Sequence, residues 1–551
     1  MARLTLALWL CLYCCGAGAG PAASAAASAA ADAAADAAAA RIRAHVAFLA
    51  DDLLEGRAAG SRGYDLAARY VASEFEALGL KPGGAAGAWF QPIELLEASA
   101  VIAAGEFSIE RDGQATRLES TVDFLPLRDY GAAQSSVTGP LEFVGYGVSA
   151  PERGYDDFAG ADLQGRIAVV LSGAPPTFDS EARAHYSATL TKLPELVRRG
   201  AIGVVIVLTP VDEARTPWPR LVQRSWFPGM RWLDADGRPV DAFAELRRAA
   251  LLGRAGAAKL FAGTGHPLEA VYAAAEAGRP QHFALPGTAT LAGQTTLARR
   301  QSANVVGLVE GADPVLRHEY VVLSAHLDHL GRGEAVGGDA IYNGALDNAA
   351  GVAVLLEVAR MLSVDGRRPK RSVLFLALTA EERGLLGSDV FARHPTVPGA
   401  LVADINMDMP VALGPLADWV AFGAEHSTLG PVAARAAAAE GYALAPDPLP
   451  EEIVFVRSDQ YMFVRQGVPS IYISTGTRSR DPAIDLRARD EDFLRERYHQ
   501  PSDDVAQPIH YPSLAGLARV NARILRAVAD APARPAWNPG DFFGSRFAPS
   551  R

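Results

Sequence analysis

The chain has 551 residues, which is long enough for two domains that each bury a hydrophobic core. Apolar residues make up 49% and charged residues 21%, a balance typical of globular proteins rather than of disordered chains or membrane bundles. The formal charge of -11 argues against nucleic-acid binding, because phosphate recognition needs a concentrated basic surface and no block of Lys and Arg is present.

Residues 1–24 are typical of a signal peptide. Arg3 precedes the short apolar stretch "LTLALWLCLYCC", and small residues follow it where a signal peptidase could cut. A transmembrane anchor is the alternative, although about twenty strongly apolar residues are needed to span a bilayer and this stretch is shorter. We therefore expect export to the periplasm or the exterior, with no stable membrane insertion after cleavage.

All cysteines of the chain lie in this same segment: Cys11, Cys14 and Cys15. The mature chain would then have no disulfide, thiol nucleophile or cysteine metal ligand. Lipid attachment at Cys14 or Cys15 is a further alternative, although neither follows the usual small-residue pattern.

The rest of the chain divides into regions of different composition and hydrophobic pattern. Residues 25–40 are rich in alanine and are interpreted as a linker or frayed helix, and residues 41–130 begin the folded part. Residues 131–287 contain short β-rich runs that indicate a separate domain. Over residues 288–530 apolar strands alternate with helices, which predicts an α/β fold with a mixed, largely parallel sheet flanked by helices. Residues 531–551 are expected to form a C-terminal tail.

Five segments of the strand and helix region carry side chains that could bind a metal. They are "SAHLDHLG" with His326, Asp328 and His329, "YNGALDNAAG" with Asp347, "TAEERG" with Glu381 and Glu382, "NMDMP" with Asp408, and "YHQPSDD" with His499. Taken singly, each has an ordinary explanation as a helix cap or a hydrogen-bonded loop residue. Because catalytic groups in such sheets gather at the carboxyl ends of strands, their joint occurrence predicts one site.

The residue types favour zinc as the metal. Zinc binds imidazole nitrogen and carboxylate oxygen where thiolates are absent, and two histidines with three carboxylates suit two zinc ions. In that arrangement Asp347 bridges the two ions. His326 and Asp408 complete one ion, Glu382 and His499 complete the other, and a bridging water takes the remaining position.

Three neighbouring side chains receive other roles. Asp328 lies two residues after His326, so its carboxylate could accept the second imidazole N–H and select the tautomer. Adjacent residues on an extended chain point in different directions, so Glu381 could move a proton from the water to the departing amine while Glu382 binds metal. A solvated pair in a loop is the alternative for the two glutamates. His329 is expected to be a structural neighbour, since five ligands suffice.

These motifs, in this order, resemble the di-zinc aminopeptidases of metallopeptidase family twenty-eight. The stretch "HVAFLADDLLEGRAAGSRGYDLAARYVASEFEALGLKPGG" resembles the N-terminal segment common in bacterial members, and "RSDQYMFVRQGVPSIYISTG" with "YHQPSDD" resembles their C-terminal half. The resemblance implies the zinc exopeptidase fold, the ligand set given above, and peptide substrates cleaved at the N-terminal residue. It also implies that the β-rich residues 131–287 are a protease-associated (PA) domain inserted into the catalytic domain, which comprises residues 41–130 and 288–530.

The chain departs from the family pattern at two places. Many relatives have His where Gln460 stands, and the charged segment "TRSRDPAIDLRARDEDFLRER" before Tyr498 is longer than usual. That segment could reshape the substrate entrance or form a solvated surface loop. Tyr461 and Arg457 are candidates for stabilising an oxyanion, but a packed Tyr and a salt-bridged Arg are equally good interpretations.

Other functions stay open at this point. A carboxypeptidase of the same fold differs in which end of the peptide it binds, and the related M-twenty family uses a similar ligand set. A glutaminyl cyclase needs one zinc and typically has no PA insertion. A receptor-like binding protein would be expected to have lost ligands, whereas Glu381 and all five proposed ligands are present. The sequence leaves the oligomeric state open.

Overall fold

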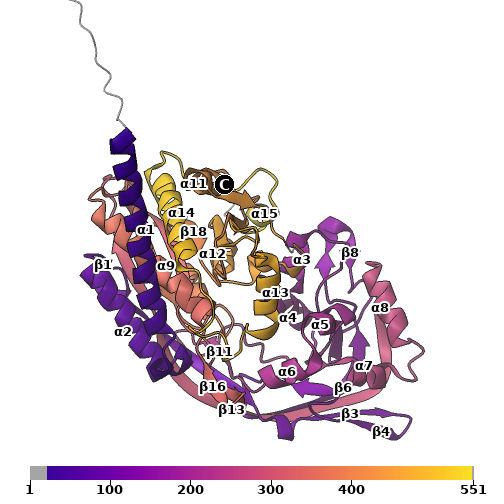
Figure 1. The fold of residues 1–551 in the computed structure, drawn as a ribbon. Coiled ribbons are helices and arrows are strands. Elements are labelled where there is room, and N and C mark those ends of the chain that lie inside the picture. Colours follow the sequence, from indigo (N-terminus) through magenta and orange to yellow (C-terminus); the bar gives the residue numbers. More distant parts are fainter. Residues whose placement is uncertain (1–20, 449, 549–551) are drawn as a thin grey trace, which may run out of the picture.

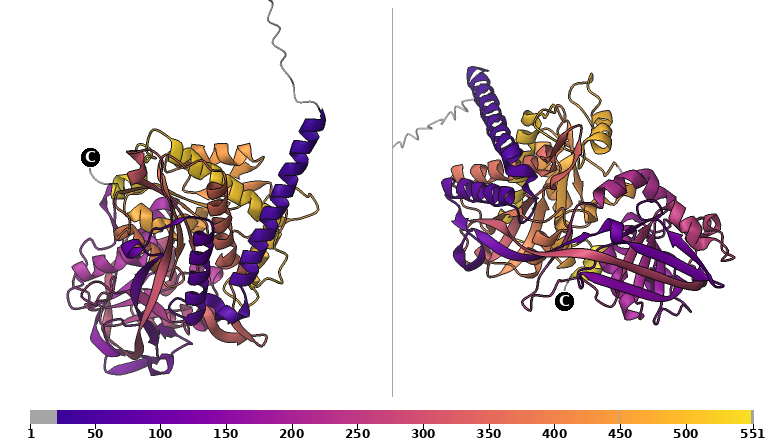
Figure 2. Two further views of the ribbon diagram at one scale, coloured as in Figure 1. Left: turned by 90° about the vertical axis from the view of Figure 1, so that its left-hand side faces the viewer. Right: turned by 90° about the horizontal axis from the view of Figure 1, so that it is seen from below.

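The computed structural model describes residues 21–448 and 450–548. Two units share one long strand, β13 (Phe283–Val309), which Figure 2 shows running from one unit into the other. Residues 1–20 of the expected signal peptide lie outside the described residues. Across the described part of the chain, no helix combines the length and the apolar character needed to cross a membrane.

The catalytic unit is built on a mixed sheet with a parallel centre. Its strands pair in the order β11, β2, β13, β17, β14, β18, β21, β19, β20, and the neighbours from β17 to β21 are parallel. The bounds are β2 Phe90–Ala100, β11 Gly229–Trp232, β14 Glu319–His326, β17 Ser372–Leu378, β18 Ala400–Asn406, β19 Asp418–Phe422, β20 Ala443–Ala445 and β21 Ser470–Thr475. The short β1 (Lys81–Pro82) pairs with the end of β13. The expected largely parallel sheet is confirmed.

Helices cover both faces of this sheet (Figure 1). Val321 and Leu323 of β14 belong to a core that includes residues of α1, α2, α9, α11 and α14, whereas Val322 belongs to a core with residues of α10, α12 and α15. Successive strand residues point to opposite faces, so the fully apolar strands are buried on both sides. The bounds are α2 Arg62–Ala77, α9 Ala350–Val364, α10 Leu386–Arg393, α11 Leu429–Ala439, α12 Gln460–Arg465, α14 Tyr511–Asp530 and α15 Phe542–Phe547.

Helix α1 (Pro21–Leu49) contains the alanine-rich stretch expected as a linker or frayed helix. Its last turns are docked by buried residues at helical spacing: Ala38, Ile42, Val46 and Leu49. Contacts with α9 and α14 hold these turns, while the first turns extend beyond the rest of the molecule (Figure 1). Packing therefore begins close to residue 41, where the folded part was expected to start.

The second unit has its own sheet and its own core. The strands pair in the order β5, β12, β10, β9, β6, β13, β3, β4, using the first half of β13. The bounds are β3 Glu106–Arg111, β4 Gln114–Leu118, β5 Phe124–Pro126, β6 Gln134–Phe143, β9 Ile167–Leu171, β10 Gly203–Val207 and β12 Ala249–Leu252. Its helices are α3 Ser180–Ser187, α4 Thr189–Arg198, α5 Pro210–Arg215, α6 Trp218–Arg224, α7 Arg254–Phe261 and α8 Leu268–Glu276. We call residues 101–294 the inserted unit, although one of its strands, β11, pairs with β2 in the sheet of the catalytic unit.

The inserted unit starts before residue 131. The hairpin of β3 and β4 pairs with residues 288–292 of β13, and β5 pairs with β12, so all three strands belong to the second sheet. The polar, exposed pattern of β4 hides this pairing in the sequence. At the other end β13 continues past residue 287, although its pairing with β6 shifts register between Leu285 and Thr288. The second half of β13 pairs with β2 and β17 of the first sheet.

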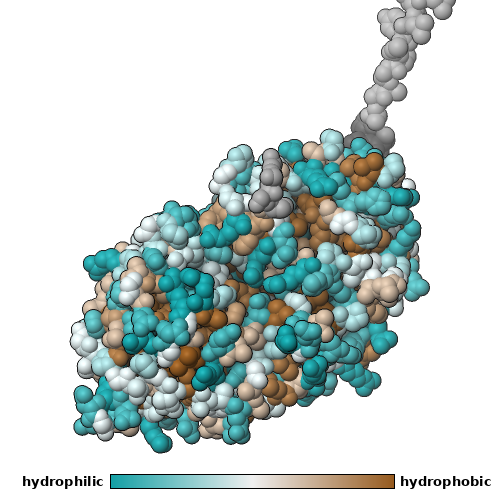
Figure 3. All heavy atoms as spheres, turned by 180° about the vertical axis from the view of Figure 1, so that it is seen from behind, coloured by the Kyte–Doolittle hydropathy of each residue, from teal (hydrophilic) through white to brown (hydrophobic). Residues whose placement is uncertain are grey.

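The last residues and the surface complete the description. The expected C-terminal tail contains α15, whose Phe543 is fully buried, so this segment is part of the fold. Two further hairpins are small: β7 (Ser149–Ala150) with β8 (Tyr155–Asp156), and β15 (Gly331–Val336) with β16 (Asp339–Tyr342). The face in Figure 3 shows small groups of hydrophobic residues among hydrophilic ones, as on most globular proteins.

Candidate active site

The expected ligands meet at the carboxyl edge of the central sheet. His326 ends β14, Glu381 and Glu382 follow β17, Asp408 follows β18, Asp347 precedes α9, and His499 follows α13 (Leu486–Glu496). Because β14, β17 and β18 are parallel, their carboxyl ends lie at one edge. The five side chains expected as ligands are each no more than 10% exposed, so they form an enclosed site.

One group of donors forms around His326. Its Nε2 lies 2.9 Å from Asp408 Oδ1 and 3.2 Å from Asp347 Oδ1. Its Nδ1 lies 3.1 Å from the backbone carbonyl oxygen of Asp328, which can only accept, so Nδ1 carries the proton in that contact. The lone pair of Nε2 is then free to bind a metal together with the two carboxylates.

A second group forms around Glu382. Its Oε2 lies 3.2 Å from His499 Nε2, and its Oε1 lies 2.7 Å from His329 Nδ1. The Asp347 Oδ2 atom lies 3.2 Å from His499 Nε2 and 3.9 Å from His329 Nδ1. We expected His329 to be only a neighbour, but two imidazoles face the same pair of carboxylates. Sequence spacing could not reveal this, because it does not fix the direction of a side chain in the loop after β14, where His329 lies.

Asp347 belongs to both groups, with one oxygen directed to each. Burial and the charge of Glu382 oppose ionisation of Asp347, but hydrogen bonds from His326 and His499 hold its pKa below the ordinary value. The pKa of Glu382 is also held well below its usual range: burial opposes this, and the charges of His499 and His329 more than compensate. Both carboxylates are therefore ionised, as metal ligands must be.

Asp328 acts through different atoms from those we expected. The backbone carbonyl of Asp328, not its carboxylate, faces the His326 ring. The carboxylate Oδ1 instead accepts the backbone N–H of Glu381 at 3.1 Å, and Oδ2 has no hydrogen-bond partner. Burial raises the pKa of Asp328 to about 6. Asp328 thus orients both the imidazole and the chain at Glu381.

Glu381 differs electrostatically from its neighbour Glu382. Burial, followed by the nearby carboxylates of Asp408 and Glu382, raises the pKa of Glu381 well above its ordinary value, although the charge of His326 opposes this. Two adjacent glutamates are therefore pushed in opposite directions, one toward ionisation and one toward proton uptake. Such a separation is typical of a site that uses one carboxylate as a ligand and the other for proton transfer.

Two residues that position the site were missed by sequence reasoning. Arg57 is fully buried and donates to the carbonyl oxygens of Leu327, Asn343 and Gly344 at 2.9, 2.6 and 3.1 Å, and also to that of Leu49. It therefore ties the loop after His326 to the loop before Asp347.

Asp503 is the second of these residues. Its Oδ1 accepts the N–H of Leu346 and its Oδ2 accepts the N–H of Asp347, each at 3.0 Å. The segment "YHQPSDD" thus supplies a carboxylate that orients the loop holding Asp347, in addition to His499 itself. The spacing of the motif was visible in the sequence, but the partner of this carboxylate was not.

The inserted unit reaches the site through α6. Arg224 places Nη2 2.6 Å from Nδ1 of His499, and Arg220 donates to the carbonyl oxygens of Arg495 and Tyr498. The charged segment before Tyr498, expected as a loop or as part of the substrate entrance, forms the helix α13, which is docked by buried Leu486 and Phe493. Two arginines of one unit therefore hold the loop of the other that carries His499.

The remaining candidates have structural partners. Gln460 is fully buried, donates to the carbonyl of Phe455 and accepts from Asn406. Arg457 pairs with Glu452 at 3.3 Å. Tyr461 is buried and packs against the ring of Phe543, with its hydroxyl 3.5 Å from His185. These contacts give each of the three a structural role.

The donor set fits a pair of divalent ions. At this site two groups each have ligand atoms within 4.8 Å of one another, one formed by His326, Asp347 and Asp408 and the other by His329, Asp347 and Glu382. Glu382 Oε1 and both ring nitrogens of His329 are buried without a hydrogen-bond partner of good geometry. Buried carboxylates and imidazoles of this kind are usually satisfied by a cation.

Comparisons with known proteins agree with this site. Residues 304–525 match the profile of Peptidase family M28. A segment of 121 residues, 21% of the chain, is 36% identical to 14% of aminopeptidase NAALADL1 of Mus musculus. A segment of 134 residues, 23% of the chain, is 34% identical to 18% of the probable glutamate carboxypeptidase LAMP1 of Arabidopsis thaliana. The chain thus matches only a small part of these two relatives.

A solved structure resembles nearly the whole chain. The aminopeptidase from Aneurinibacillus sp. strain AM-1 superposes with a TM-score of 0.53 over 92% of this chain and 97% of its own, at 20% identity. At this identity the likeness concerns the fold. Residues 304–525, the part of the chain that matches Peptidase family M28, contain every expected metal ligand together with Glu381 and Asp328.

Proposed function

We propose that the protein is an exported zinc exopeptidase that removes N-terminal residues from peptides. The observation that carries this proposal is the pair of ligand groups that share Asp347, with Glu381 beside them on the same chain turn. The family match and the names of two similar proteins, both aminopeptidases, support the same reaction class. The apolar, uncharged stretch after Arg3 supports export.

The residues that would hold two zinc ions follow from the donor groups. Asp347 would be shared, with His326 and Asp408 on one side and Glu382 with His499 on the other. His329 is the alternative imidazole on the second side, because its Nδ1 lies 2.7 Å from Glu382. When bound, such ions supply Lewis acidity that makes a water acidic and polarises a peptide carbonyl.

The proton transfers fall to the side chains. Glu381 would take a proton from the attacking water and deliver it to the nitrogen of the departing amine. Asp328 holds the backbone of Glu381 through its carboxylate and orients His326 through its carbonyl. Arg57 and Asp503 hold the two loops between which the substrate carbonyl would bind.

We further propose that the inserted unit is a PA domain that shapes access to the site. The contacts of Arg220 and Arg224 with the loop around His499 support this role, because they place α6 at the rim of the site. One observation favours a carboxypeptidase as a second candidate: the Arg224 guanidinium beside His499 could pair with a substrate C-terminal carboxylate.

The test is hydrolysis by purified mature protein of two substrate sets, aminoacyl chromogenic amides and N-blocked peptides with a free C-terminus. Cleavage of the amides alone supports the aminopeptidase, and cleavage of the blocked peptides alone moves the assignment to the carboxypeptidase. Glu381→Gln should lower either activity by about 10²- to 10⁴-fold, while bound zinc, measured by mass spectrometry, stays unchanged. Glu334→Gln, an exposed glutamate, is the control. If the protein binds no zinc and cleaves neither substrate set, the proposal of an enzyme is contradicted and a binding role is favoured.

A further inference from the structure

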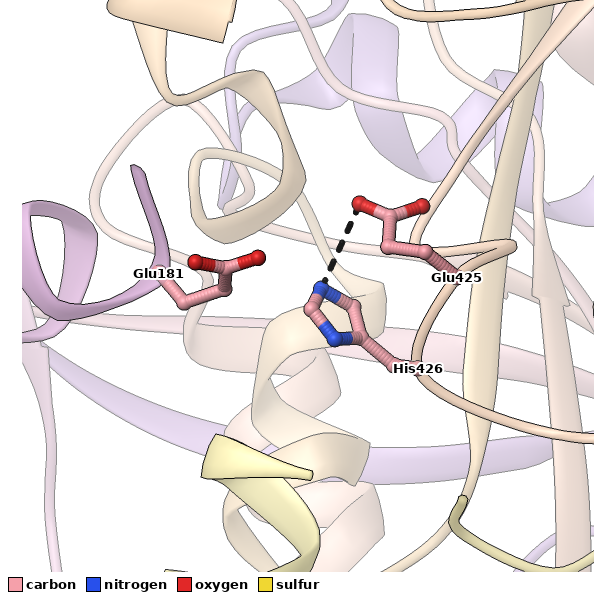
Figure 4. A group of neighbouring side chains, drawn as sticks. All are labelled: Glu181, Glu425 and His426. Atoms are coloured by element: carbon pink, nitrogen blue, oxygen red, sulfur yellow. Dashed lines mark ion pairs between the residues drawn. The ribbon is translucent and has the colours of Figure 1, made fainter. Parts of the chain in front are cut away.

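A second group of potential metal ligands lies where the inserted unit meets the catalytic unit. Glu181 comes from α3, and Glu425 and His426 come from the loop between β19 and α11. Figure 4 shows the two glutamates on either side of the His426 ring. Their ligand atoms all lie within 4.8 Å of one another. None of these residues belongs to the site built around Asp347.

The His426 ring is held in one orientation. Its Nδ1 lies 2.7 Å from Asp541 Oδ2, while Oδ1 of the same carboxylate accepts the N–H of Gly544 at the start of α15. The rings of Phe455 and Phe543 pack beside it at 4.9 and 5.0 Å, and the side chain is only 4% exposed. Nε2 is thereby directed at the two glutamates, 3.5 Å from Glu425 Oε1. A carboxylate on the far ring nitrogen is the usual support of a metal-binding histidine.

The two arginines that line the same cavity have partners of their own. Arg153 pairs with Asp179 at 2.8 Å, and Arg546 lies 3.6 Å from Glu152 and donates to the hydroxyl of Tyr186. Among the described residues, neither Glu181 nor Glu425 forms an ion pair with a lysine or arginine, and burial raises the pKa of Glu181. Two carboxylates thus face the imidazole of His426 with no lysine or arginine of the described chain paired to either of them.

We propose that Glu181, Glu425 and His426 bind a divalent metal ion, and that zinc is the ion this site prefers. One imidazole with two carboxylates is a donor set that suits zinc, whereas calcium and magnesium prefer oxygen ligands alone. The group opens onto a surface cavity of about 980 Å³, so water can complete the coordination. Because Glu181 belongs to the inserted unit, the ion ties this unit to the catalytic unit.

The experiment compares zinc binding in three forms of the full mature protein. Wild type, the double variant Glu181→Gln/Glu425→Gln, and the control Glu152→Gln are equilibrated with the same excess of zinc chloride, desalted and analysed by mass spectrometry. Glu152 lines the same cavity but is paired with Tyr186 and Arg546, so its loss should leave the ion in place. We expect wild type and Glu152→Gln to carry about one zinc per chain more than the double variant.

Anomalous diffraction at the zinc absorption edge locates each bound ion, independently of the total zinc content measured per chain. A peak between His426 Nε2 and the two glutamates is the expected result. Asp541→Asn should weaken binding at this position by roughly 10- to 100-fold, because the imidazole loses its supporting carboxylate. Equal zinc contents in wild type and the double variant overturn the proposal, as does a map with peaks at the Asp347 site alone.

Discussion

Arg57 provides the sharpest test of how the site is built. Its guanidinium is fully buried and donates to four backbone carbonyls, those of Leu49, Leu327, Asn343 and Gly344. A buried acceptor left unsatisfied costs ~1–3 kcal/mol, so Arg57→Ala should lower the free energy of unfolding by at least about 4 kcal/mol. Arg57→Lys keeps the charge but cannot reach all four oxygens from one nitrogen, and about half of that loss is expected.

The lysine variant also separates folding from catalysis. Leu327 adjoins His326 and Gly344 lies three residues before Asp347, so loosening both loops should misplace ligands by fractions of an ångström. Misplacement on the order of 1 Å can cost about 100-fold in rate, so Arg57→Lys should lower kcat/KM on the preferred substrate by roughly 10- to 100-fold. Urea unfolding followed by circular dichroism gives the stability, with Arg62→Lys, an exposed arginine five residues later, as the control. Stability losses no larger than those of Arg62→Lys would refute the reasoning.

Three further predictions test separate parts of the molecule. Glu381→Gln should lower kcat/KM by about 10²- to 10⁴-fold with the bound metal unchanged, since only proton transfer is removed; loss of metal would contradict this role. Asp503→Asn should weaken metal retention roughly 10- to 100-fold by releasing the Asp347 loop, measured by competition with a chelator. Burial raises the pKa of Asp157 from 3.8 to about 6, so its stabilising contribution is present below 3.8 and is lost as the pH rises through 6. Wild type should therefore lose ~3 kcal/mol relative to Asp157→Asn across this window in pH-dependent urea unfolding, and a constant difference would contradict the assignment.

The parts of the fold that follow from pattern were predictable. The apolar strands ending in His326, Leu378 and Asn406 alternate with helices, which is enough to predict a parallel centre and a shared edge. The limits of the inserted unit could not be predicted, because β13 is one continuous strand where its two halves meet. A strand that pairs with one sheet in its first half and another in its second has no signature in composition.

The candidate site, like the fold, could be predicted from the sequence only in part. Residue types and order predict which carboxylates and imidazoles gather, because each lies next to the end of a strand or beside an end of a helix. They do not tell which atom of Asp328 faces His326, since a sequence pattern places the residue but not its individual backbone and side-chain atoms. The four partners of Arg57 come from the end of α1, the loop after β14 and the loop before Asp347, so only the folded chain identifies its role.

The adjacent glutamates show how one chain turn serves two functions. Ala380 has a positive φ of 55°, which turns the chain immediately after β17 and before Glu381. The Asp328 carboxylate then holds the N–H of Glu381, so the turn is anchored on the acid that orients the His326 loop. From there Glu382 meets His329 and His499, whose charges favour its ionised form, while Glu381 lies among carboxylates that favour proton uptake. The pKa values of Glu381 and Glu382 differ because one backbone turn places two identical side chains in different surroundings. One glutamate can therefore act as a metal ligand and the other as a proton carrier.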